Sequence, residues 1–193
     1  MKTKYFVLIL CAMSLISSCI SPSKKQSNNC VSPQEEQSEN ILCTDYNITD
    51  ANGKKQGLWI EESGRTRIER HYKDGIRSGV YKQFFAGKLS ILGEYTNDKE
   101  SGIWYIYDNE RVWMTFENHA QNYDTITREW DKKRYVPDYK CYSKAYYPNG
   151  NIKDEGWLLW NEGESPESDL SIEYGEWKYY DEEGNLVRTK VFQ

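Results

Sequence analysis

A spacing of about 23 residues recurs along this chain of 193 residues and limits the folds that it can adopt. A glycine, one variable residue and a large aromatic residue form a triplet that begins at Gly57, Gly79, Gly102 and Gly175. Glycine, asparagine and aspartate supply the positive φ of tight turns, whereas aromatic and β-branched residues favour strands. Each period therefore predicts one β-hairpin.

The residues between the turns follow a strand pattern. The stretch 88–96 alternates in side-chain character, as a strand with one apolar face does. A glycine or turn pair about every ten residues leaves no window for a stable helix. We expect an all-β fold, an antiparallel β-meander of repeated hairpins whose neighbouring units bury one another's aromatic rings. A glycine beside a tryptophan would let a neighbouring ring or backbone approach closely.

The Gly-x-Trp triplets, the Tyr-x-x-Gly elements and the stretch YYDEEGNL at 179–186 resemble the MORN repeat, in particular its divergent bacterial antitoxin-type variant. The resemblance covers residues 49–117 and 142–190 and implies an elongated sheet that serves as a scaffold. The third unit departs from the pattern, since Asp108-Asn109-Glu110-Arg111 stands where a turn glycine is expected. Residues 118–141 and 161–173 lose the period, and we interpret both as insertions, either functional or merely tolerated.

The N-terminal part indicates export. Lys2 and Lys4 precede the apolar run 5–16, which is too short to span a membrane and fits a signal-peptide core. The sequence Ile16-Ser17-Ser18-Cys19 resembles the lipobox of bacterial lipoproteins, whose cysteine carries diacylglycerol and acyl chains such as palmitate. An ordinary secretory signal with an accidental cysteine is the alternative.

These features divide the chain into three parts: a lipoprotein signal peptide at 1–18, a lipidated flexible tether at 19–40 and a β-repeat domain at 41–193. The tether is too polar to bury a core. Lipid on Cys19 would anchor the protein to a membrane, and Ile20 after it resembles lipoproteins of the outer membrane. The side of the membrane that the domain faces stays open.

Charge excludes one class of partner. The formal net charge is −5, and loss of residues 1–18 with their two lysines brings it to −7. A nucleic-acid partner is not expected, because binding the phosphate backbone requires clustered lysine and arginine.

Reactive side chains are sparse. His71 and His119 lie in different units without triad or zinc spacing, and Cys141 has no recognisable base beside it. We therefore expect no catalytic residue, no cofactor, no metal site and no enzyme activity. A pair of catalytic carboxylates, as in glycosidases, is the alternative that the number of acids leaves open. Three cysteines follow Cys19, namely Cys30, Cys43 and Cys141, and the sequence does not decide whether two of them form a disulfide.

Aromatic residues make up 15% of the chain and could form an exposed strip or fill the core of the sheet. The candidate interaction surface comprises Trp104, Tyr107, Trp130, Trp157, Trp160 and Trp177. The favoured hypothesis is a lipid-anchored envelope protein that presents a β-repeat scaffold to a protein partner. A carbohydrate- or peptidoglycan-binding module is the alternative, and an immunity or antitoxin-type protein, which the family label alone implies, is the third.

Overall fold

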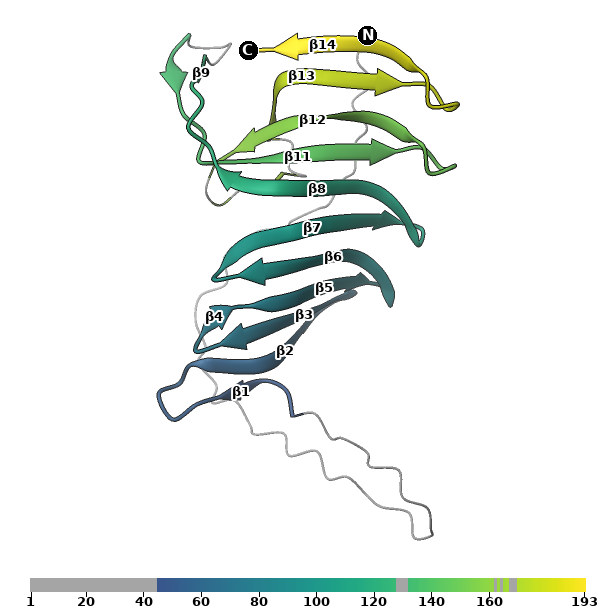
Figure 1. Ribbon diagram of the computed structural model, residues 1–193. Coiled ribbons are helices and arrows are strands. Elements are labelled where there is room, and N and C mark those ends of the chain that lie inside the picture. The colour runs from purple at the N-terminus through teal and green to yellow at the C-terminus, as the bar shows by residue number, and fades with distance from the viewer. Residues whose placement is uncertain (1–44, 128–131, 162, 164, 167–169) are drawn as a thin grey trace. The chain divides into compact units, whose positions relative to one another are not determined.

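The computed structural model describes residues 45–127, 132–161, 163, 165–166 and 170–193, and the regular structure in these ranges is entirely β (Figure 1). The main strands are β2 (Lys55–Ser63), β3 (Thr66–Lys73), β5 (Gly79–Phe85), β6 (Lys88–Thr96), β7 (Lys99–Asp108), β8 (Arg111–Gln121), β11 (Tyr139–Tyr146), β12 (Ile152–Trp160), β13 (Ile172–Tyr180) and β14 (Leu186–Phe192). Four two-residue strands complete the set: β1 (Ile48–Thr49), β4 (Ile76–Arg77), β9 (Ile126–Thr127) and β10 (Arg134–Tyr135). The all-β prediction is confirmed.

Strands that follow one another in the sequence also pair with one another, so the predicted antiparallel meander is confirmed. The order is β1-β2-β3-β5-β6-β7-β8-β11-β12-β13-β14, with β4 beside β3. The direct pairing of β8 with β11 is a break in the sequential order, and β9 and β10 form a small sheet of their own. Among the described strands, β14 pairs with β13 and leaves its other edge open.

Two-residue turns connect strands in the first half of the sheet. Both central residues have positive φ in the turns Ala86–Gly87, Asn97–Asp98 and Asn109–Glu110. This geometry matches the right-handed twist of the strands on either side. The third unit therefore turns without the expected glycine, because Asn109 and Glu110 themselves adopt φ values of 48° and 67°.

Two glycines leave room for a tryptophan ring of the next strand to pack directly on the backbone, and we call each of them a seating glycine. A Cβ on Gly93 of β6 would lie 2.3 Å from the indole of Trp104 on β7, and a Cβ on Gly156 of β12 would lie 2.4 Å from Trp177 on β13. In both pairs the indole N–H donates to the carbonyl that follows the glycine, at 3.2 Å for Trp104 and Glu94 and at 3.0 Å for Trp177 and Trp157. Each ring therefore lies flat against the neighbouring backbone.

Two glycines of the Gly-x-aromatic triplets, Gly102 and Gly175, have a different role from Gly93 and Gly156. Gly102 and Gly175 have φ values of 65° and 67°, and the strand register shifts beside each of them. At each shift the three residues of the triplet lie against one residue of the partner strand, a larger form of β-bulge. The bulge places the tryptophan opposite the seating glycine.

The main core cluster lies on one face of the sheet, while Leu159 on β12 is buried on the opposite face. The buried members of the cluster are Tyr81, Trp104, Phe116, Cys141, Leu158, Trp160 and Trp177. Ring contacts connect consecutive strands, since Tyr81 and Trp104 have centroids 5.2 Å apart and Tyr95 meets Trp104 edge to face at 5.0 Å. Large rings contribute most of the apolar area that such a sheet can bury.

The irregular segment 118–141 is shorter than predicted and contains a hairpin. Strand β8 continues to Gln121 and β11 begins at Tyr139, so the excursion from the main sheet covers residues 122–138. Within it β9 pairs with β10, with Arg134 opposite Thr127. The excursion covers 17 residues, and without it the turn glycines Gly87 and Gly150 would lie two periods apart. We therefore interpret it as an insertion between two units of the repeat and call it the displaced hairpin. The second predicted insertion, 161–173, corresponds to the connection between β12 and β13.

Candidate interaction site at the C-terminal edge

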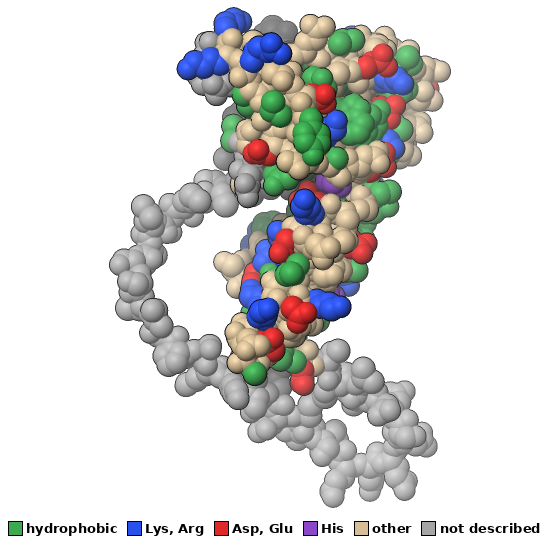
Figure 2. Space-filling view, turned by 60° about the vertical axis from the view of Figure 1, so that its left-hand side comes forward, with side chains coloured by type: hydrophobic (Ala, Val, Ile, Leu, Met, Phe, Trp, Pro, Cys, Tyr) green, Lys and Arg blue, Asp and Glu red, His purple; other side chains and the backbone are tan. Residues whose placement is uncertain are grey.

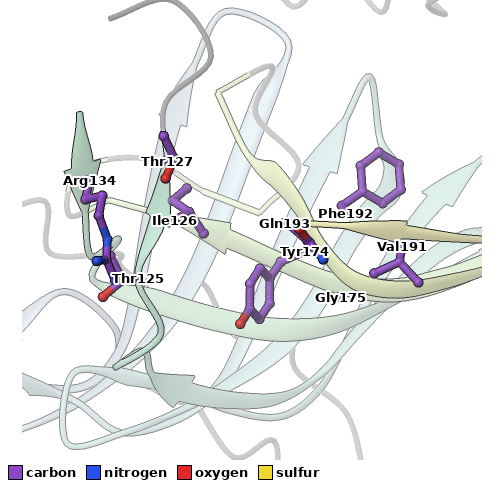
Figure 3. A pocket seen from close by; sticks show the side chains of 9 residues that line it. All are labelled: Thr125, Ile126, Thr127, Arg134, Tyr174, Gly175, Val191, Phe192 and Gln193. Atoms are coloured by element: carbon purple, nitrogen blue, oxygen red, sulfur yellow. The ribbon is translucent and has the colours of Figure 1, made fainter. Parts of the chain in front are cut away.

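A groove lies between the displaced hairpin and the last two strands of the main sheet (Figure 3). Its volume is about 590 Å³. The hairpin contributes Thr125, Ile126, Thr127 and Arg134, and β13, β14 and the residue after them contribute Tyr174, Gly175, Val191, Phe192 and Gln193. Apolar, hydroxyl and cationic groups thus meet beside the open edge of β14.

Hydrogen bonds fix the displaced hairpin at its base. The amide of Asn122, which is buried, donates to the carbonyls of Asp124 and Pro137, both at 3.0 Å, and its oxygen accepts the N–H of Asp124 at 3.1 Å. The Asn122 N–H donates to the Asp138 carbonyl at 2.9 Å. Lys140 on β11 adds an ion pair with Asp124 at 3.1 Å. The two strands of the hairpin therefore leave the sheet from a single polar junction.

The outer strand β14 combines exposed apolar side chains with cations. Val187 and Val191 are 62% and 61% exposed. Arg188 and Lys190 alternate with them and lie on the core face, where the guanidinium is 4.2 Å from the centroid of the Tyr179 ring and the ammonium is 3.7 Å from that of Phe192. Lysine and arginine side chains lie at this end of the molecule and also over the strands at the other end (Figure 2).

Three of the six residues predicted to form an interaction surface are core residues instead. Trp104, Trp160 and Trp177 are 7%, 5% and 5% exposed, because each packs among the rings of the neighbouring strands. This corrects their assignment. Tyr107 and Trp157 are half-buried, while Trp130 and the predicted lipidation site Cys19 lie outside the described residues.

Trp157 lies in a polar environment. Tyr142 meets its ring edge to face at 5.4 Å, and Lys140 Nζ lies 5.6 Å from the ring centroid. Glu155, two residues earlier, accepts a hydrogen bond of 2.7 Å from Tyr180. Burial and then Glu155 raise the pKa of Tyr142 to about 12, and the hydrogen bond to Glu155 raises that of Tyr180 to about 12. Both phenols stay protonated as donors at neutral pH.

The histidines and Cys141 are not brought together in a cleft. His71 Nδ1 lies 3.1 Å from the Val80 carbonyl. His119 stands between the rings of Trp104 and Trp160, and its Nδ1 is 3.2 Å from Glu100 without hydrogen-bond alignment. Cys141 has no exposed surface. Its thiol is therefore closed to an external substrate in this conformation.

A second groove at the other end of the strand order is less suited to a partner. It lies at the β2–β3 and β5–β6 hairpin ends and has a volume of about 560 Å³. Arg67, which lines it, pairs with Glu69 at 2.8 Å and lies 3.5 Å from Glu62. Arg67 is therefore already paired within the sheet, and Arg65, which also lines the groove, lies 4.7 Å from the centroid of the Phe85 ring.

Comparison with known proteins gives no relative: no family model, curated protein or solved structure matches the chain. Among the described residues, no cluster of three or more histidine, cysteine, aspartate and glutamate side chains could hold a metal ion. The part of the chain that the structure describes also contains no helix with the length and hydropathy that crossing a bilayer requires.

Proposed function

We propose that the protein is a lipid-anchored component of the bacterial cell envelope whose β-repeat sheet docks another protein. The apolar run 5–16 and the lipobox-like sequence ending at Cys19 support the anchor, and Ile20 supports the outer membrane as its location. Both segments lie outside the described residues. The polar composition of residues 20–40 supports a tether between the lipid and the domain.

The observation that carries the docking role is the open edge of β14 beside the groove. Among the described strands β14 pairs with β13 alone, so every second residue of this seven-residue strand directs its backbone N–H and C=O to the open side. A strand edge of this kind readily accepts an extended segment of another chain. The groove extends the contact onto the displaced hairpin. Three of the six predicted surface aromatics are buried in the core. What the surface offers a partner is therefore the strand edge and the groove more than a set of exposed aromatic rings.

Photo-cross-linking in intact cells tests this proposal. A photoreactive residue at Val191, in the groove, is expected to trap one defined envelope protein. The same residue at Lys73, exposed on β3, is the matched control and should trap little. Cys19→Ala should release the protein from the membrane and reduce the adduct. Random neighbours at both positions, or a membrane-bound Cys19→Ala variant, would contradict the proposal.

Trp157 favours glycan binding as a second candidate function. Its half-buried ring is surrounded by Tyr142, Lys140 and Glu155, and sugars are commonly held between a ring face and polar groups. Peptidoglycan fragments should then change the tryptophan fluorescence of the protein, and Trp157→Ala should abolish that change. Fluorescence that does not respond to a panel of cell-wall glycans would exclude this candidate.

A further inference from the structure

Comparison of β14 with the equivalent strands of the repeat indicates which kind of strand could pair with its open edge. Gly93 and Gly156 each lie six residues after the turn glycines Gly87 and Gly150, and Lys190 lies six residues after Gly184. The register agrees, since Gly93 is opposite Tyr81 and Lys190 is opposite Trp177, both of them triplet aromatics. Lys190 thus stands at the position where the repeat seats the next tryptophan.

This substitution stops the array. A single Cβ at Gly93 or Gly156 would already come within 2.4 Å of the tryptophan on the next strand. The longer side chain of Lys190, placed over Phe192, blocks another Gly-x-Trp unit in the same way. An inward-pointing charge on an edge strand is a known means of preventing such growth. The occupant of the edge is therefore not a further copy of the repeat.

Some cations of the sheet pair with acids on adjacent strands. Lys144 on β11 meets Glu117 on β8 at 2.6 Å, and Arg70 on β3 meets Glu61 on β2 at 2.8 Å. Arg188 and Lys190 form no ion pair with the described residues, although each lies over a ring. Acids on a strand added at the open side of β14 would lie directly opposite these two cations.

We infer that β14 binds an extended, acidic segment of another protein, which adds to the sheet as its next strand. Arg188 and Lys190 lie on one face at alternate positions, so the segment carries carboxylates at alternate positions. Val187 and Val191 lie on the opposite face of β14, so apolar residues are favoured between the carboxylates of the bound segment. The inference deepens the proposed docking function and rests on it.

A peptide assay with the full-length lipidated protein in detergent tests the inference. The probes are two end-blocked, labelled peptides, one of alternating valine and glutamate and one of alternating valine and lysine. The glutamate peptide should bind about tenfold or more tightly than the lysine peptide, and added salt should narrow the difference. Hydrogen exchange of the β14 amides should slow on binding.

Matched variants identify the residues responsible. Arg188→Glu with Lys190→Glu should reverse the preference between the two peptides. Lys73→Glu with Lys88→Glu changes net charge equally at exposed positions away from β14 and should leave the preference unchanged. Circular dichroism establishes that both variants fold, and reversed binding itself demonstrates a folded edge. Equal binding of both peptides to the wild-type protein, or an unreversed preference, overturns the inference.

Two other occupants are outcomes of the same experiments. A dimer in sedimentation that the double glutamate variant disrupts would assign the edge to a second copy of the chain. Peptide binding that appears only after deletion of residues 20–40 would assign it to the tether. Both results overturn the inference. If a partner is trapped at Val191 and the Arg188→Glu, Lys190→Glu variant traps it equally well, this inference is wrong and the proposed function stands. If the peptides bind as expected but no envelope partner is trapped, the proposed function is wrong.

Discussion

Two residue types decide how closely neighbouring strands pack in this sheet, glycine and tryptophan. The sequence predicted that glycine would let a ring approach closely, but the glycine next to the tryptophan in the triplet is a bulge residue. The seat is Gly93, eleven residues before Trp104 and on the adjacent strand. The spacing along the sequence identifies the glycines that recur. The pairing of the strands is needed to say which tryptophan packs on which glycine.

Gly93→Ala should destabilise the protein by about 3 kcal/mol, since the added methyl group meets the Trp104 ring at 2.3 Å and an overpacked core costs about 1–3 kcal/mol or more. Gly93 does not have a positive φ, so the cost is steric alone. Urea unfolding measures it. Glu94→Ala is the control, because the Glu94 side chain is exposed and its carbonyl remains available to the indole. Equal urea midpoints for the two variants would contradict the packing of Trp104 on Gly93.

Asp154→Asn should raise the melting temperature at neutral pH. Burial raises the pKa of Asp154 above its usual 3.8, Lys153 lowers it, and Glu173 raises it further. The charged form is therefore disfavoured in the fold at neutral pH, and this cost disappears once pH falls below 3.8. The two proteins should melt alike at pH 3 and differently at pH 7 in calorimetry. A stabilisation that persists at pH 3 would point to a cause other than charge.

At the scale of the element, the hairpins could be predicted from turn residues and the displaced hairpin could not. Tight turns leave a local signature in glycine, asparagine and aspartate. The displaced hairpin has Thr125-Ile126-Thr127 in its first strand and no Gly-x-aromatic triplet among its described residues, so no local signal marks it as a hairpin. The part of it that the structure describes also lacks the glycine bulge and the tryptophan with which β7 and β13 pack on the strands before them. The pairing of β8 with β11 is a long-range choice that no local pattern records.

Replacement of residues 122–138 by Asn-Gly should yield a folded protein. Gln121 is opposite Tyr139, so a two-residue turn can close β8 onto β11 directly. We expect a cooperative transition in urea and an unaltered β spectrum in circular dichroism. The midpoint should be lower, because buried Ile126 and Pro137 are removed. An unfolded product would show that the displaced hairpin is required by the sheet. If the variant folds, loss of the Val191 cross-link would trace the partner contact to the groove.

At the scale of the whole molecule, the face of the sheet that packs decides which residues remain available to a partner. Alternation along a strand predicts two faces but does not state which one is covered. For that reason Trp104, Trp160 and Trp177 could be identified as large rings but not as core residues. The open edge was equally hidden, since it depends on the order of all the strands.

Acid should weaken the sheet at several of its turns together. Backbone N–H donors, from Lys54 to Asp50, Arg77 to Asp98 and Asn185 to Asp181, lower the pKa of these three carboxyls below 3.8. The stability that they contribute is present above pH 3.8 and is lost as pH falls through the lower folded values. Urea midpoints measured from pH 7 to pH 2 should fall in this range, and less steeply when all three are asparagine. Identical slopes for the two proteins would assign the acid sensitivity to other groups.

The displaced hairpin leaves the polarity of the main sheet intact. It contributes one strand in each direction and departs and returns at neighbouring positions, so β8 and β11 still pair antiparallel. A meander of this kind can therefore carry an additional hairpin between any two of its strands without rearranging the rest of the ladder.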